Sequence, residues 1–292
     1  MDLGIWDGAA VLVKAGLYAA TLGAAGGIFF LAYSRSLLER GDHLAIARTL
    51  RILVAVAIAA SAARVLITAG SMSEDAAGML DARLLAMVWH GGEGRAAALR
   101  AGGLLLAIPA LAHGGGRGRG LAIVGAALAA TSFAWVGHVH AAARTAAPLL
   151  LGIHILAVAF WLGALAPLLI LTRRREPRAL GAVAARFGRI AVAVVAALLA
   201  AGAAVLWILL GSFSELWSSG YGCLACVKIA FVACLLALAG WNKLRLVPRI
   251  VAGDALAVRS LRRSIRAEML VAGLILLITA ALTTLAGPPS MS

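Results

Sequence analysis

Apolar runs long enough to cross a lipid bilayer follow one another along almost the whole of this 292-residue chain. A spanning helix needs roughly 20 mainly apolar residues, and only helices or closed barrels satisfy their backbone polar groups in lipid. None of the runs shows the alternation of a membrane strand. We therefore predict an all-α polytopic protein with about eight transmembrane helices, forming a single membrane domain over residues 1–292. The runs cover about residues 9–33, 44–69, 96–112, 120–141, 147–171, 182–210, 223–242 and 267–286.

The composition excludes an ordinary soluble domain, because 63% of the residues are hydrophobic and only 13% are charged. Little length is left for a domain outside the membrane. The segment from Met79 to His90 is apolar on one side but too short to span, so we expect an interfacial or re-entrant piece before Gly91.

The charged residues indicate the orientation. Lys and Arg number 26 against 12 Asp and Glu, a net charge of +14. The basic residues lie in short clusters at alternate links and lack the interleaved aromatic residues of a nucleic-acid surface, so we expect a lipid bilayer and no nucleic acid as partner. The basic links are predicted to be cytoplasmic, which places both termini in the periplasm of a bacterial inner membrane. These links hold Arg35, Arg40, Arg48, Arg51, Arg117, Arg119, Arg173, Arg174, Arg175, Arg178, Lys243, Arg245, Arg249, Arg259, Arg262, Arg263 and Arg266.

Four of the six histidines fall on the predicted periplasmic face: His90, His138, His140 and His154. His138 and His154 lie near the ends of two runs joined by a short link, so they are expected at comparable depth in neighbouring antiparallel helices. These two imidazoles could share one metal ion. His138 and His140 lie about 200° apart around a helix, so we favour His138 as the ligand and place His140 at the mouth of the site.

Softer ligands occur on the same side of the membrane. Met87 and His90 have the i, i+3 spacing that brings two side chains onto one helix face. Cys223 and Cys226 have the same spacing. Thioether and thiolate groups favour Cu(I), and imidazole binds copper in either oxidation state. We therefore include these four residues as candidate copper ligands.

Other ionisable residues at membrane depth are ambiguous. Lys228 and Arg64 could extend to the interface as ordinary snorkelling side chains, whereas Glu268 is expected to pair with Arg266 or Lys243. The sequence contains no serine-hydrolase, phosphate-loop or zinc-protease motif. We therefore expect a protein that is not an enzyme.

Several short motifs in the second half of the chain resemble the bacterial copper resistance protein D family, CopD. The resemblance is clearest from about residue 131 to the C-terminus, whereas the first three runs match in number and polarity alone. The motifs are Trp135-Val-Gly-His138, His154-x6-Trp161-Leu-Gly163, Tyr221-Gly222-x5-Lys228, Asn242-x5-Pro248 and Arg266-Ala-Glu268.

The resemblance implies an inner-membrane protein that takes copper from the periplasm, beside a periplasmic copper carrier (CopC-like), and is associated with copper import and resistance. His138 and His154 match the family's histidines, whereas Cys223, Cys226, Met87 and His90 rest on the topology alone. Our leading interpretation is a copper permease. The alternatives are a membrane redox protein and a copper-independent scaffold. The redox protein would hold a b-type haem between His138 and His154, or would be a quinone-linked thiol oxidase using the two cysteines.

Overall fold

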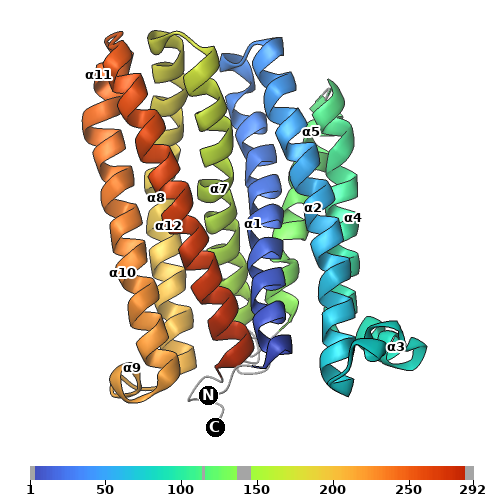
Figure 1. Cartoon of the computed structure of the whole chain (residues 1–292). Coiled ribbons are helices and arrows are strands. Elements are labelled where there is room, and N and C mark those ends of the chain that lie inside the picture. The colour runs from blue at the N-terminus through green and yellow to red at the C-terminus, as the bar shows by residue number, and fades with distance from the viewer. Residues whose placement is uncertain (1–3, 114–115, 137–145, 287–292) are drawn as a thin grey trace.

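The long apolar runs form helices that lie side by side in one bundle (Figure 1). The structure, a computed structural model, describes residues 4–113, 116–136 and 146–286, and these ranges contain no strand. The long helices are α1 (Ile5–Ser34), α2 (Arg40–Ser73), α4 (Gly92–His113), α5 (Gly116–Thr131), α7 (Ala146–Arg174), α8 (Pro177–Leu210), α10 (Gly220–Trp241) and α12 (Ala255–Leu285).

Short elements connect these helices. They are η1 (Arg35–Leu37), η2 (Ala76–Leu80), α3 (Ala82–His90), η3 (Ser132–Trp135), α9 (Glu215–Ser218), the π-helical turn η4 (Asn242–Leu246) and α11 (Val247–Val251). The helix α3 lies beside the end of α2, outside the main bundle (Figure 1). It falls within the segment Met79 to His90, for which the interfacial or re-entrant location stays a prediction.

Seven helices in the described part of the chain are long and apolar enough to cross a membrane, with mean hydropathies from 1.2 to 2.7. They are α1, α2, α5 with η3, α7, α8, α10 with η4 and α11, and α12. The helix α4 packs against α5 in the same bundle and corresponds to the third predicted run. The prediction of an all-α, multi-pass membrane protein is therefore confirmed.

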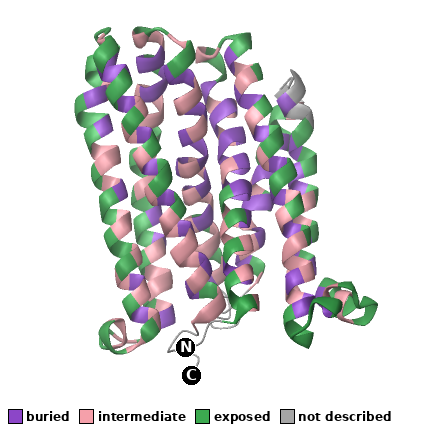
Figure 2. Ribbon diagram, viewed as in Figure 1, coloured by how far each residue is buried: buried purple, intermediate pink, exposed green. Residues whose placement is uncertain are grey.

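The helices α1 and α7 occupy the centre of the bundle, where buried residues gather in Figure 2. In their most apolar windows 61% of residues are buried, against 17% for α8 and α10. The two central helices cross at Gly26 and Gly163, where the glycine Cα atoms allow direct backbone contact. A Cβ atom at Gly26 would lie 1.7 Å from the carbonyl oxygen of Ala159. Small residues thus set this crossing, as is usual between helices in lipid.

The two ends of the bundle differ in charge. The start of α1, the end of α12, α3 and α9 lie at one end, and the links α1–α2, α7–α8 and α10–α12 lie at the other (Figure 1). At the second, basic end, Arg175 pairs with Glu39 and Asp42, and Arg174 pairs with Asp42 at 3.4 Å. These ion pairs join the end of α7 to the α1–α2 link.

Candidate metal-binding site

His154 lies near the start of α7 and faces α8. Its Nδ1 atom is 3.1 Å from the carbonyl oxygen of Leu198. A carbonyl oxygen can only accept, so Nδ1 must carry the hydrogen and donate it. In the neutral imidazole the lone pair is then on Nε2. Histidine ligands of metals commonly have this arrangement, with the second ring nitrogen held by a carbonyl group.

Gly202 on α8 makes room for the imidazole. A Cβ atom at this position would lie 2.9 Å from both Nδ1 and Cε1 of His154. Real Cβ contacts are essentially never so short, so a larger residue would move the ring away from the Leu198 carbonyl. The close approach of α8 to His154 therefore depends on glycine at position 202.

The surroundings of His154 are mainly apolar. Ala157, Trp161, Leu198 and Leu235 form a buried cluster between α7, α8 and α10. Lys228 on α10 is close enough to interact electrostatically with His154. A metal cation at His154 would therefore meet an apolar wall and a positive charge. The interactions of this ring in the described part of the chain include no acidic side chain.

His138 is predicted at the depth of His154, and His140 at the mouth of the site. His138 and His140 lie outside the described residues, so their predicted roles stay predictions. Among the residues that are described, there is no group of three or more His, Cys, Asp or Glu side chains that could hold a metal ion. Within the described ranges, His154 therefore belongs to no such group.

Met87 and His90 are exposed on α3, with Met87 59% exposed. The helix α3 packs against α2 and α4, on the opposite side of the bundle from α9 and the start of α10 (Figure 1). Met87 and His90 therefore cannot bind one ion together with Cys223 or Cys226.

Cys223 and Cys226 lie at the start of α10, and both are free thiols. Their sulfur atoms point to the carbonyl oxygens of Trp217 and Leu216 around α9, each at 3.8 Å. The two thiol groups therefore lie against the segment around α9.

Sequence reasoning missed a polar cluster in the N-terminal half, centred on Arg100 of α4. This side chain is 2% exposed. Its Nε donates to Ser132 Oγ at 3.1 Å and its Nη1 to Ser61 Oγ at 3.0 Å, while the guanidinium lies 4.3 Å from the Phe133 ring centroid. The positive charge is thus buried against two hydroxyl groups and an aromatic face.

Two further cations, on α2 and α1, also have polar partners on other helices. Arg64 of α2 pairs with Glu93 of α4 at 3.2 Å, which shows that Arg64 does more than extend to the interface. Lys14 of α1 donates to the carbonyl oxygen of Thr283 on α12 at 3.0 Å. Charged residues at membrane depth were the available signal, but these residues are so far apart in sequence that they form no motif.

Glu268 corrects one prediction from the sequence. Its partner is Asn242, whose Nδ2 atom donates to the carboxylate, and both side chains are buried. The expected partner Arg266 is exposed, because two residues on a helix point about 200° apart. The contact joins the π-helical turn η4 to α12.

The bundle and the histidine held between α7 and α8 define a multi-pass helical membrane protein with an imidazole inside its helix packing. Two family models match the chain: Copper resistance protein D-like, N-terminal domain, over residues 5–147, and Copper resistance protein D, over residues 181–282. The chain belongs to the copper resistance protein D family. Comparisons with curated proteins and with solved structures gave no match.

The two matches extend the resemblance seen in the sequence into the first half of the chain. The C-terminal match includes Lys228, Asn242 and Glu268. His154 lies between the two matched segments. The family assignment makes this a copper-resistance-related membrane protein. Because His154 lies outside both matches, its assignment as a candidate ligand comes from its hydrogen bond to Leu198.

Proposed function

We propose that this protein is a permease of the bacterial inner membrane that binds copper at its periplasmic face and passes it inward, without catalysing a covalent reaction. Membership of a copper resistance family supports the choice of copper. The observation that carries the proposal is the orientation of His154, whose Nδ1 donates to Leu198 so that Nε2 has the lone pair for the metal. A CopC-like periplasmic carrier would deliver the ion.

The chemistry of the surroundings favours a soft, weakly hydrated cation. The positive charge of Lys228 repels a cation near His154. The affinity for the metal ion must therefore come from coordination and not from charge attraction. Imidazole nitrogen supplies such coordination for copper. Because a metal and a proton compete for the same lone pair, protonation of the imidazole would also release the ion. His138 is the proposed second ligand.

The test compares His154→Ala and His138→Ala with the unchanged protein. Bound copper is measured by metal analysis of purified protein, and accumulated copper is measured in cells that express each variant. We expect both values to fall for both variants. The matched control is His43→Ala, which removes a histidine near the start of α2 at the basic end and should leave both values unchanged.

Unchanged bound and accumulated copper in both site variants would reject the proposal. The same purified samples separate the alternatives, because a b-type haem protein would show strong visible absorption bands. A copper-independent scaffold would bind no copper and would still retain its protein partners.

A further inference from the structure

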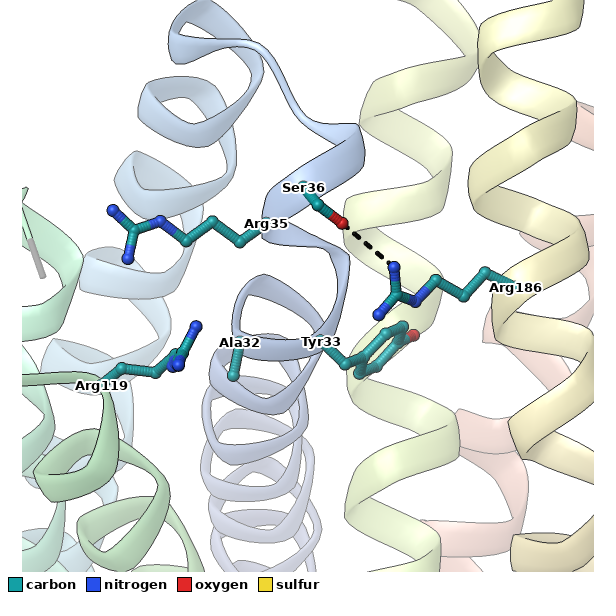
Figure 3. A pocket seen from close by; sticks show the side chains of 6 residues that line it. All are labelled: Ala32, Tyr33, Arg35, Ser36, Arg119 and Arg186. Carbon is teal, nitrogen blue, oxygen red and sulfur yellow. Dashed lines mark hydrogen bonds between the residues drawn. The ribbon is translucent and has the colours of Figure 1, made fainter. Parts of the chain in front are cut away.

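A cavity of about 510 Å³, open to the outside, lies at the basic end of the bundle (Figure 3). His154 lies toward the start of α7, which is at the other end of the bundle (Figure 1). Its wall comes from the end of α1 and from η1, α5 and α8. Figure 3 shows Arg119 of α5 and Arg186 of α8 approaching the α1 segment from either side. The lining residues are Ala32, Tyr33, Arg35, Ser36, Arg119 and Arg186.

The residues that line this cavity are strongly basic. Three of the six are arginines and none is acidic. The nearby carboxylates of Glu39 and Asp42 are engaged elsewhere, by Arg174 and Arg175. Guanidinium groups bind phosphate oxygens through paired N–H donors, so the wall has the chemistry of a phosphate site.

A neutral hydroxyl group adds to the cationic groups. Arg186 donates from Nη1 to Ser36 Oγ at 3.1 Å, which holds this guanidinium in place and leaves the Ser36 hydroxyl hydrogen for an acceptor. An anion in the cavity would supply that acceptor.

The surface next to the cavity favours a lipid as the carrier of that anion. Ile123 and Ile190 lie four positions after Arg119 and Arg186, on the same faces of α5 and α8 and one turn deeper in the bundle, and are 38% and 36% exposed. Acyl chains could lie along these apolar helix faces while the headgroup meets the arginines. We propose that this cavity binds a phosphate group, carried by an anionic phospholipid. Basic pockets between helices on the cytoplasmic side are suited to this role.

The experiment measures phosphatidylglycerol binding to the delipidated full-length protein by native mass spectrometry, with phosphatidylcholine as the uncharged comparison. The unchanged protein should prefer phosphatidylglycerol. The double variant Arg119→Gln, Arg186→Gln should bind it roughly thirtyfold more weakly, from the usual contribution of two basic residues near a membrane surface. The variant Arg119→Lys, Arg186→Lys keeps the charge but loses the paired N–H donors, so its binding should lie between those of the unchanged protein and the glutamine variant.

The matched control, Arg48→Gln with Arg259→Gln, removes the same charge from two exposed arginines at the same end that do not line the cavity. It should bind phosphatidylglycerol normally. A separate titration with inorganic phosphate identifies the source: binding of phosphate but not phosphatidylglycerol, with the same dependence on Arg119 and Arg186, would support the site and assign it a soluble ligand. The proposal is overturned if the folded site variant binds both probes normally, or if the control loses as much binding.

Discussion

Two residues that are remote from His154 in sequence fix the orientation of its ring and the nitrogen that carries the hydrogen. Leu198 accepts its Nδ1 hydrogen, and Gly202 leaves space for the ring. Leu198 and Gly202 are four positions apart, so both lie on the same face of α8. The histidine motif in α7 indicates a candidate ligand, but the structure shows which nitrogen faces the carbonyl.

Substituting Gly202→Ala tests this arrangement without removing the histidine. The new methyl group would lie 2.9 Å from the imidazole and displace it from the Leu198 carbonyl. If His154 binds copper, the affinity should fall about 10- to 100-fold, as is typical when the partner of a ligand histidine is lost. Competition with a Cu(I) chelator measures the change.

Gly188→Ala is the control on the same helix. Its methyl group would lie 3.7 Å from Lys243 Cγ, an ordinary contact, so copper affinity should stay the same. Equal affinities for the Gly202 and Gly188 variants would contradict a role for the His154 orientation.

The helices α1 and α7 approach each other so closely that packing at their crossing decides the shape of the bundle. Gly26 and Gly163 meet through backbone atoms. The Trp161-Leu-Gly163 motif therefore combines two structural roles, with Trp161 in the cluster against α8 and α10 and Gly163 against α1. The sequence showed the small residues but could not show which helices they join.

Gly26→Ala should destabilise the protein by more than the roughly 1–3 kcal/mol typical of an overpacked core. The added Cβ atom would overlap the carbonyl group of Ala159, and backbone atoms cannot rotate away as a side chain can. Thermal unfolding in detergent measures the loss. Gly16→Ala, on the same helix but with open space around the new Cβ atom, should be unchanged or slightly more stable. A similar unfolding temperature for the two variants would contradict the claim that the contact between α1 and α7 at Gly26 has no room for a Cβ atom.

Across the molecule, the basic links at one end and the start of α1 with the end of α12 at the other follow the alternation predicted from the sequence. The structure separates candidates that a linear topology places on one membrane face. Met87 and His90 lie on α3, whereas Cys223 and Cys226 lie across the bundle at α9 and α10. Residues on the same membrane face therefore need not belong to the same binding site.

Labelling from outside the cell tests the orientation. In a variant with Cys226→Ser and Cys234→Ser, the exposed Cys223 should react with a membrane-impermeant maleimide in intact spheroplasts. A cysteine replacing Arg259, in a chain with the three native cysteines changed to serine, should react only after the membrane is permeabilised. The reverse pattern would invert the predicted topology.

The sequence by itself determined the all-α class, the approximate positions of the spans and the separation of basic links, because apolar length and charge are local properties. The tertiary structure decided the hydrogen bond of His154, the Asn242–Glu268 contact, the cluster around Arg100 and the arginine-lined cavity. The physical reason is that these helices are apolar around most of their circumference, so their pattern does not indicate which face points inward. Contacts between small residues set the rotation and neighbours of each helix, and these contacts join positions far apart along the chain.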